Sequence, residues 1–493
     1  MHNPDNIWRS SRLFLIVILI IAAFAQGDGA AGAGEVAGQV SGILQQDSVD
    51  ELLFLPLLRG NRSIVTPISV LPGTPRVNAP FFEQNLTSSR GAIFWFGRVT
   101  SEVNYADVRV GYTAEALHIH INVFDRFVWH DRSPSPGSLR EWDATSLYLS
   151  PDGSSAYRFD AQVSHNDDLS AYLVAYKNSV SGWQIDSIPV ASESFWRGNS
   201  PNDNVEDRGW WIYYHIPFSS LGLSGAPIQE STWKMGVKLY DRDDEVGTPR
   251  PVQAWPFQSI SDNPDTWGEL VFGLPSYSAP SGVNSSGSIT IRHKLNGAVV
   301  KDAMVGGGTL CGQGLHFWDE WGETNYAGRE QINIQNQIDV ADWPCFSKLY
   351  LTFPLDQLPP GKVILSADLT LHQFGNSGGG EYGEPPLSLI QVLTVAEDWE
   401  ENALTWNNAP RMLENVSRAW VEPIQELADW RGLPRTWDIS LALAQAYQAR
   451  QPLRLVLYSA DAPMHTGKYF FSSKVDDYSA QSRPTLTVVW GDP

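Results

Sequence analysis

Short runs that alternate apolar and polar residues recur along the chain, and long amphipathic helical patterns are rare. The stretch 208–245 is the clearest example. An aromatic run, Trp210 to Ile216, ends at Pro217, which cannot donate to a strand ladder, and a loop rich in Ser and Gly follows. A second run, starting at Trp233, alternates apolar and polar residues. The pattern predicts two strands paired as a hairpin.

Similar strands, separated by Gly, Pro, Asn and Asp, predict an all-β protein of two antiparallel, jelly-roll-like β-sandwich domains in tandem. We expect the first domain over residues 76–275 and the second over 289–493, joined by a linker at 276–288. Because the linker is poor in large apolar groups, it predicts few contacts between the domains. One helix is expected, Leu441 to Arg450, with Ser440 as its N-cap.

The N-terminal segment has the pattern of an export signal. Arg9 and Arg12 precede an apolar run, Leu13 to Ala25, that ends in an Ala-x-Ala cleavage pattern. The run is shorter than the ~20 residues of a spanning helix, so we expect no stable membrane span after cleavage, although an uncleaved anchor is the alternative. The sequence therefore predicts a signal peptide (1–25), a low-complexity tether (26–75), and a secreted or cell-surface location.

Composition narrows the function classes. The 493 residues carry a formal net charge of −21 without a basic stripe, which argues against nucleic-acid binding. Aromatic residues make up 12% of the chain and include 20 Trp, which suits either sugar-stacking surfaces or aromatic cores. The two cysteines, Cys311 and Cys345, are expected to form a disulfide in an exported chain, with two free buried thiols as the alternative.

Motifs in the first domain resemble a known family. The sequence IPF..LGL at 216–223, YDRDD at 240–244 and PDTWGELVFG at 264–273 resemble the closing half of a family 9 carbohydrate-binding module, which is DOMON-like. Its opening half is similar to residues 107–112, 116–125 and 142–149. The chain departs from the family pattern at three positions where acidic residues are expected, namely Ser146, Ser150 and Tyr213.

The second domain resembles another family. Its motifs KLYLTFPL at 348–355, TWNNAP at 405–410 and RPTLTV at 483–488 resemble the DNRLRE-type carbohydrate-binding domain, a sandwich of secreted bacterial proteins. The two resemblances together imply an exported, non-catalytic protein that binds a polysaccharide or glycoconjugate. A structural or adhesive cell-surface protein without sugar binding is the first alternative, and a cryptic glycoside hydrolase is the second.

Sugar-binding sites combine flat aromatic rings with hydrogen-bonding side chains. In the first domain we expect them on loops, where Trp129 and Trp255 form the leading pair and Trp183 and Trp196 are the next candidates. The polar partners expected beside them are Arg126 and Gln253. Trp210, Trp233 and Trp267 lie in strand patterns and are assigned to the core.

The end of the second hairpin strand is rich in carboxylates. Asp241, Asp243 and Asp244 offer hard oxygen ligands that suit calcium, and the family 9 resemblance implies structural calcium. Solvated charges at a strand end are the alternative. No cofactor is expected to be required for binding.

Two further patterns have a chemical and a structural interpretation. Asp319 and Glu320, flanked by Trp318 and Trp321, have the residue types of a glycosidase pair. Adjacent carboxylates on an extended chain point to opposite faces, so a structural or sugar-contacting loop is favoured. His118 and His120 alternate on a strand and are expected to face solvent rather than bind zinc.

Overall fold

The computed structural model describes residues 73–83, 88–164, 169–246, 249–337, 344–379, 383–426 and 429–493. The predicted signal peptide and nearly all of the tether lie outside these residues. The described chain is built almost entirely from β-strands, and α3 is its one α-helix. Within these ranges no helix has the length and apolar character needed to cross a membrane.

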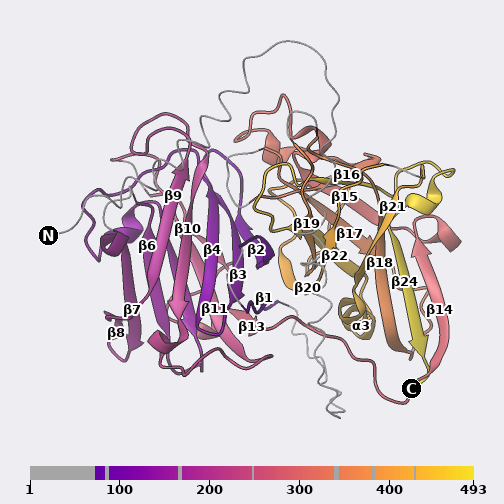
Figure 1. Cartoon of the computed structure of the whole chain (residues 1–493), viewed down its shortest axis with the longest axis horizontal. Coiled ribbons are helices and arrows are strands. Elements are labelled where there is room, and N and C mark those ends of the chain that lie inside the picture. The colour runs from indigo at the N-terminus through magenta and orange to yellow at the C-terminus, as the bar shows by residue number, and fades with distance from the viewer. Residues whose placement is uncertain are drawn as a thin grey trace, which may run out of the picture. The chain divides into compact units, whose positions relative to one another are not determined.

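The first sandwich pairs a five-stranded sheet, in the order β2-β3-β4-β10-β9, with a layer ordered β1-β13-β11-β5-β6-β7-β8 (Figure 1). Strand β12 pairs with β11 at the side of this layer. The strands are β1 (Arg76–Ala79), β2 (Ala92–Gly97), β3 (Tyr105–Tyr112), β4 (Ala116–Phe124), β5 (Ala144–Ser150), β6 (Tyr157–Gln162), β7 (Leu173–Ser179), β8 (Gly182–Ile185), β9 (Ala191–Arg197), β10 (Gly209–Pro217), β11 (Thr232–Tyr240), β12 (Gln253–Trp255) and β13 (Gly268–Phe272).

The two strands predicted in the 208–245 stretch are present as β10 and β11, but they do not pair with each other. β10 pairs with β4 and β9, and β11 pairs with β5 and β13. Between them the 3₁₀ turn η5 (Phe218–Leu221) ends at Gly222, whose φ of 80° is left-handed. The connection therefore crosses from one layer of the sandwich to the other, and the predicted hairpin is wrong.

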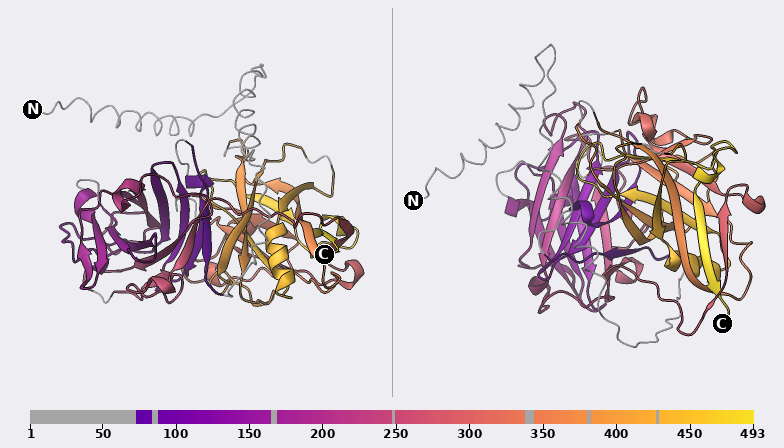
Figure 2. Two further views of the ribbon diagram at one scale, coloured as in Figure 1. Left: turned by 90° about the horizontal axis from the view of Figure 1, so that it is seen from below. Right: turned by 45° about the vertical axis from the view of Figure 1, so that its right-hand side comes forward.

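The second sandwich pairs strands ordered β15-β17-β22-β19-β20 with a sheet ordered β14-β24-β18-β23-β16, to which β21 adds beside β18. Helix α3 (Ser440–Gln448) lies against β18 and β22 (Figure 2). The strands are β14 (Ser285–Arg292), β15 (Lys301–Gly306), β16 (Gln331–Ile334), β17 (Ser347–Phe353), β18 (Val363–Asn376), β19 (Ser388–Val395), β20 (Met412–Val421), β21 (Leu433–Asp438), β22 (Leu453–Ser459), β23 (Lys468–Phe471) and β24 (Thr485–Gly491).

The helix differs from its prediction at its start. Ser440 is the first helical residue rather than the N-cap, and the side chain of Asp438 accepts a 2.9 Å hydrogen bond from the Ser440 N–H. The Ser440 hydroxyl instead accepts a hydrogen bond from the backbone N–H of Ala367 on β18. The hydroxyl is thus used to attach the helix to the sheet.

The two sandwiches share a hydrophobic core, so the expectation of few contacts between them is wrong. Along β17, Leu349 and Leu351 face the core of the second sandwich, while Lys348 and Tyr350 face the opposite way. That opposite side packs against the outer face of β2, β3 and β4, where Tyr105 joins the same core cluster as Tyr350. Backbone pairing also joins the two sandwiches, because β1 of the first sandwich pairs in parallel with β20 of the second.

Polar contacts reinforce this interface. Arg109 on β3 is fully buried and forms an ion pair with Asp107. Its guanidinium donates 2.9 Å hydrogen bonds to the carbonyl oxygens of Ala460 and Gln337 in the second sandwich. A charged group buried in this way is held in place by its partners on both sides. The 273–284 segment is therefore a covalent link between two halves that also bind each other through side chains.

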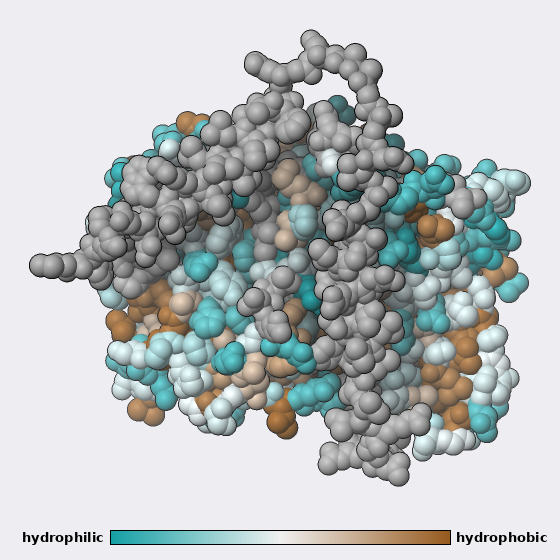
Figure 3. All heavy atoms as spheres, in the orientation of Figure 1, coloured by the Kyte–Doolittle hydropathy of each residue, from teal (hydrophilic) through white to brown (hydrophobic). Residues whose placement is uncertain are grey.

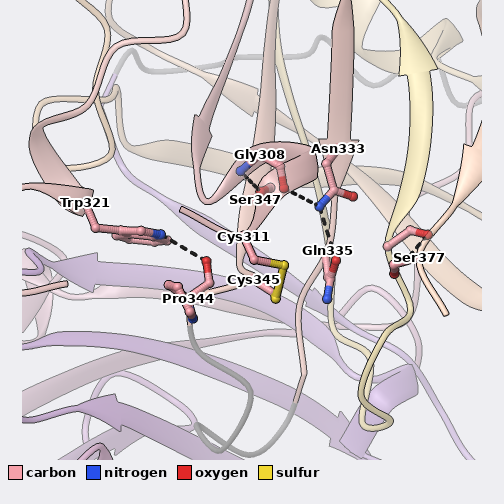
Figure 4. Close-up of a disulfide and its surroundings, with 10 residues drawn as sticks. Gly308, Cys311, Trp321, Asn333, Gln335, Pro344, Cys345, Ser347 and Ser377 are labelled. Carbon is pink, nitrogen blue, oxygen red and sulfur yellow. Dashed lines mark hydrogen bonds between the residues drawn. A yellow bond between two sulfur atoms is a disulfide. The ribbon is translucent and has the colours of Figure 1, made fainter. Parts of the chain in front are cut away.

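Cys311 and Cys345 form a disulfide in the second sandwich (Figure 4). It joins the residue after the 3₁₀ turn η8 (Gly308–Leu310) to the segment that enters β17. Nearby, the Trp321 ring N–H donates to the Pro344 carbonyl oxygen, and the Asn333 side chain donates to the Gly308 carbonyl oxygen (Figure 4). The disulfide thus lies among loops that hydrogen bonds hold together at the end of the sheet.

Candidate functional site

The leading pair of predicted sugar-stacking residues is buried. Trp255 is 4% exposed because it lies on β12, opposite Val237 of β11, and points into the core. Its ring packs against Phe94 at 4.2 Å between centroids. Trp129 is 7% exposed, and its backbone N–H is held by Asp143 at 2.6 Å. Trp129 lies in a loop as predicted and Trp255 lies on a short strand, but both rings are buried and neither offers an open stacking surface.

Trp183 lies on β8 and is half-buried at the outer face of the β5-β6-β7-β8 layer. Arg158 on β6 lies between Tyr176 and Trp183, at 3.7 Å and 5.3 Å from the ring centroids. Asp160 pairs with Arg158 and accepts a 2.6 Å hydrogen bond from Ser146. Arg158, Asp160, Tyr176 and Ser146 are almost completely buried, so this face is a packed aromatic and ionic layer, and the Trp183 ring is half-buried at its surface.

The remaining predicted polar partners lie elsewhere. Arg126 forms a 2.8 Å hydrogen bond to Glu206 in the segment before β10, and its guanidinium lies over the Phe127 ring. Gln253 donates to the carbonyl oxygen of Pro251 at 2.8 Å. The Trp183 ring N–H donates to Asp262, and the Trp196 ring N–H donates to the Asn199 carbonyl oxygen at 2.9 Å. The residues predicted together are thus distributed over several parts of the sandwich.

Trp196 lies opposite the buried Trp210 and packs against the core, so it adjoins the outer face of β4, β10 and β9 without being part of it. Its ring stacks on Phe195 at 5.4 Å with an interplanar angle of 19°. Phe195 lies directly opposite Trp211 of β10, and Trp211 lies opposite Asn122 of β4. Because side chains alternate along a strand, Phe195, Trp211 and Asn122 all point to the same face.

The next positions along these strands extend this row. Tyr213 lies opposite His120 on β4 and opposite Glu193 on β9. His215 lies opposite His118. Phe195, Trp211, Tyr213 and His215 are partly exposed, whereas His118 and His120 are buried beneath them. We call the surface formed by Phe195, Trp211, Tyr213, His215, His118 and His120 the aromatic face.

Ring contacts and hydrogen bonds fix the geometry of the aromatic face. His120 stacks on Trp211 at 5.1 Å and 28°, and its Nε2 donates to Asn122 Oδ1 at 3.0 Å. His118 Nδ1 lies 2.5 Å from the Tyr213 hydroxyl, and its buried Nε2 has no hydrogen-bond partner in the structure. The rings are therefore oriented before any ligand arrives.

The two buried histidines are uncharged near neutral pH. Burial lowers the pKa of His120 to about 3; the nearby charge of Arg109 adds to this, and the hydrogen bond to Asn122 opposes it. Burial also lowers the pKa of His118 to about 4, with a smaller contribution from His215. The prediction that both face solvent is wrong, because aromatic residues of β10 and polar groups of β3 surround them. The aromatic face thus offers neutral rings and hydrogen-bonding nitrogens.

Sequence reasoning singled out Trp196 but missed Trp211, Tyr213 and Phe195. The signal was present in β10, where Trp210, Ile212 and Tyr214 are core residues and the alternating positions are also aromatic. A strand with aromatic residues on both faces indicates that its second face is used. The pattern alone does not show which aromatic residues of the neighbouring strands lie on that face.

Acidic residues gather just beyond the C-terminal ends of β4 and β11. Carboxylate oxygens of Asp125, Asp241 and Asp243 all lie within 4.8 Å of one another, and Asp125 and Asp241 are buried. Asp243 accepts a hydrogen bond from Arg250, and Asp125 accepts one of 2.8 Å from the Trp210 ring N–H. Asp241 Oδ1 is buried without a hydrogen-bond partner in the structure. Two of the three predicted metal ligands are thus brought together with Asp125, which the sequence did not indicate, while Asp244 is outside the group.

The electrostatics of this acidic group fit a cation. Burial and the neighbouring Asp243 raise the pKa of Asp125 to about 7, although hydrogen bonds from Trp210 and from the Phe127 N–H oppose the shift. Burial, Asp125 and Asp243 together raise the pKa of Asp241 well above its usual value. Buried carboxylates that repel one another are stabilised by a divalent ion with oxygen ligands, and calcium has that preference. Asp125, Asp241 and Asp243 are the residues that could hold it.

The residues considered for glycosidase chemistry do not form a catalytic pair on an aromatic platform. Trp318 and Trp321 are fully buried and belong to the shared core. Asp319 is paired with His316 at 2.8 Å, and Glu320 accepts a hydrogen bond from the His316 backbone N–H. The two carboxylates therefore stabilise their own loop, in agreement with the structural interpretation.

A comparison with known protein families finds a match within the second sandwich. Residues 319–488 match the model of carbohydrate-binding module family 96. The match includes most of the strands from β16 to β24. A module of this class binds carbohydrate and is not itself catalytic, so the chain is a carbohydrate-binding protein over this part. No curated protein sequence matches the chain.

The comparison with solved structures gives matches with low TM-scores. One, from Bacteroides uniformis ATCC 8492, is described as a candidate carbohydrate-binding protein; it is 16% identical over 41% of this chain and 100% of its own, with a TM-score of 0.33. A family 9 module from Caldicellulosiruptor kristjanssonii in complex with glucose is 13% identical over 41% of this chain and 98% of its own, with a TM-score of 0.26. A family 9 module from the same organism in complex with cellotriose is 13% identical over 42% of this chain and 99% of its own, with a TM-score of 0.26.

Proposed function

We propose that this chain is an exported, non-catalytic polysaccharide-binding protein and that the aromatic face of the first sandwich contacts the glycan. The observation that carries the site assignment is the directly opposed row Asn122, Trp211 and Phe195, extended by Tyr213 and His215 on the same face. Sugar rings offer apolar C–H faces bordered by hydroxyl groups. The aromatic face offers flat rings beside the neutral His118 and His120, the Asn122 amide and the Glu193 carboxylate, which is the complementary chemistry.

The described surface in view (Figure 3) mixes hydrophobic and hydrophilic residues. On the described part of the face shown in Figure 3, hydrophobic residues lie in small groups among hydrophilic ones. Large contiguous apolar patches are typical of protein interfaces. The family 9 resemblance of the first domain and the DNRLRE-type resemblance of the second belong to this proposal, and so does export, which the signal-like N-terminus and the Cys311–Cys345 disulfide support.

Affinity electrophoresis of the full chain tests the aromatic face. Native gels would contain hydroxyethylcellulose, xylan or glucomannan, and retardation by the polymer reports binding. Trp211→Ala is expected to weaken binding to the retarding polymer by about tenfold to a hundredfold, the scale of an interface hot spot. Phe81→Ala removes an aromatic that is 45% exposed elsewhere on the same sandwich, and it is the matched control.

Trp183→Ala separates this site from its main competitor. If Trp183→Ala abolishes retardation while Trp211→Ala does not, the glycan binds at the β5-β6-β7-β8 layer and the aromatic face is not the site. If the parent protein is retarded by no polymer, the structural or adhesive alternative replaces sugar binding. Release of reducing sugar from the same polymers would favour the hydrolase alternative.

We also propose that Asp125, Asp241 and Asp243 bind calcium with a structural role. The unpartnered Asp241 oxygen and the raised pKa values support a bound cation. The group joins the ends of β4 and β11, which belong to the two opposing layers of the sandwich. A cation there would fasten the layers together near Arg126 and Trp129 without contacting the aromatic face.

A further inference from the structure

We infer that the second sandwich carries a phosphate-binding site on its outer β14-β24-β18 face, built around Arg292 and His372. The inference goes beyond the proposed polysaccharide-binding function and does not depend on it. Strands β14, β24 and β18 lie side by side in the sheet (Figure 1). Arg292 is the last residue of β14 and is half-buried. Within the described residues its guanidinium forms no ion pair and no hydrogen bond.

The register of the strands places Arg292 and His372 on the same face of the sheet. Arg292 lies directly opposite Thr485 of β24, and Thr485 lies opposite Thr370 of β18. His372 is two residues beyond Thr370 on β18, so its side chain points the same way. Leu371, which lies between Thr370 and His372, belongs to the core of the second sandwich. The face that carries Arg292 and His372 is therefore the outer one.

A tight turn holds Arg431 beside His372. The Asp429 side chain accepts a 3.0 Å hydrogen bond from the Arg431 N–H, and the Asp429 carbonyl oxygen accepts another of 3.0 Å from the Gly432 N–H. Gly432 has a φ of 80°, and a Cβ there would lie 2.6 Å from the Gln373 carbonyl oxygen and 3.4 Å from the His372 carbonyl carbon. Only glycine allows this close approach to β18, so the turn is seated against the strand at His372.

The cationic groups of this region lie close enough for their charges to interact. Burial and the charge of Arg483 lower the pKa of Arg292. Burial also lowers the pKa of His372, and the charges of Arg292 and Arg431 lower it further. A backbone hydrogen bond and the charge of Asp429 oppose this second shift. We call Arg292, His372, Arg431 and Arg483 the basic cluster, and groups that repel one another in this way are stabilised when an anion binds among them.

Carboxylates do not balance the cations of the basic cluster and its neighbour Lys294. Three cations share two carboxylates, in the pairs Arg431–Asp429, Arg483–Asp477 and Lys294–Asp477. Arg292 is a fourth cation, and it pairs with no carboxylate of the described residues. The region therefore has two more cationic than anionic side chains, a charge that a phosphate dianion balances. The net charge of −21 belongs to the whole chain, and charges farther away than the Debye length of about 8 Å are largely screened.

Polar atoms without partners also lie at the basic cluster. His372 Nδ1 and the hydroxyl of Ser482, the residue before Arg483, are buried and have no hydrogen-bond partner in the part of the chain that the structure describes. The cations of the cluster come from β14, from the turn before β21 and from the segment before β24. A carboxylate pairs with one guanidinium in a plane, whereas a phosphate group accepts hydrogen bonds through three oxygens. Donors on separate elements therefore favour phosphate over a single carboxylate.

The test uses the full chain in calcium-free buffer and measures the binding of inorganic phosphate by isothermal titration calorimetry at constant ionic strength. Arg292→Gln removes the unpaired charge and is expected to raise the Kd for phosphate by about tenfold to a hundredfold. Arg431→Gln should raise it by about threefold to tenfold, because Asp429 already shares the charge of Arg431. Arg98→Gln is the matched control, since Arg98 is exposed on the first sandwich. Equal melting temperatures without phosphate confirm that every variant is folded.

Two further ligands identify the anion and its source. Acetate that binds as tightly as phosphate would overturn the assignment, because any carboxylate would then suffice. Glycerol 3-phosphate that binds within about threefold of inorganic phosphate supports a phosphate ester as the ligand, and binding of inorganic phosphate alone supports the free ion. A parent chain that binds no phosphate, or an Arg292→Gln variant that binds it like the parent, overturns the site. If Arg292→Gln does not fold, Arg431→Gln decides by the same criterion.

Discussion

The side-chain nitrogen of Lys348 on β17 donates a 2.9 Å hydrogen bond to the hydroxyl of Tyr105 on β3. The ammonium group also lies 4.0 Å from the Trp95 ring centroid and 3.8 Å from that of Trp406. A lysine of the second sandwich is therefore enclosed by aromatic rings contributed by both halves. Burial lowers the pKa of Lys348 well below its usual value, and nearby Asp107 opposes this shift.

This enclosure predicts a large difference between two substitutions of Lys348. Lys348→Ala leaves a cavity and removes the cation–π contacts, so it should lower the free energy of unfolding by about 3 to 5 kcal/mol. Lys348→Met fills a similar volume without a buried charge and should lower it by less than about 1.5 kcal/mol. Urea denaturation followed by Trp fluorescence measures both. Equal midpoints for the two variants would contradict the enclosure.

The shared core also predicts how the chain responds to cutting at its linker. Proteolysis between residues 276 and 287 should nick the chain, but the halves should stay together on size-exclusion chromatography under native conditions. The reason is that Arg109, Lys348 and the aromatic cluster join the sandwiches independently of the backbone. The uncut protein should accordingly show one calorimetric transition. Separate elution of two stable fragments would show that the interface is weak.

The sequence predicts those features of the fold that depend on residues close together along the chain. The aromatic run Trp210 to Ile216 and the alternation that starts at Trp233 correctly predicted two strands. They could not predict that β10 and β11 belong to opposite layers, because pairing partners are set by contacts with β4 and β5 that are remote in sequence. The composition of residues 276–288 likewise predicted a linker, but it could not predict that the outer faces of two sheets pack against each other.

The site was less predictable for the same reason. β12 has only three residues, so Trp255 showed no alternation that would mark it as a core residue, and the Pro256 after it suggested a loop. Asp125 ends β4 and reaches Asp241 and Asp243 only after the sandwich closes. Trp183 and Trp196 were both named, yet only the folded sheet shows that Trp196 adjoins an aromatic row while Trp183 covers an ionic layer.

Calcium should stabilise the folded protein if the acidic group binds it. In protein stripped with EGTA, adding calcium to a hundredfold excess over its Kd should raise the free energy of unfolding by about 2.7 kcal/mol and shift the melting temperature upward. Asp241→Asn removes a buried carboxylate and should abolish the shift. Asp265→Asn, at an exposed position outside the group, should retain it. An unchanged melting temperature in the parent would rule out a structural calcium ion.

The depressed histidine pKa values predict acid sensitivity. His120 has a pKa of about 3 when folded, below the ~6.5 of an unfolded histidine, so the unfolded chain binds more protons between these values. The stability contributed by neutral His120 is fully present above about pH 6.5 and is lost as the pH falls toward 3. His120→Gln should flatten the dependence of the melting temperature on pH in this window. The facing groups are Arg109, Asn122, Trp211 and Tyr213, and the parent and variant share all of them.

An equal slope in His120→Gln and the parent would place the acid sensitivity in other groups.

Burial predicts opposite roles for two tryptophans of the first sandwich. Trp255 packs against Phe94 in the core, and its six-membered ring would lie 2.5 Å from a Cβ placed at Gly268, which shows how tightly it is enclosed. Trp255→Ala should therefore lower the free energy of unfolding by about 3 to 5 kcal/mol, the cost of removing a large core side chain. Trp211→Ala removes a partly exposed ring and should cost clearly less, while it weakens glycan binding. Urea midpoints and affinity electrophoresis of the same two preparations separate these effects. A Trp255→Ala variant as stable as the parent would mean that its ring is not part of the core.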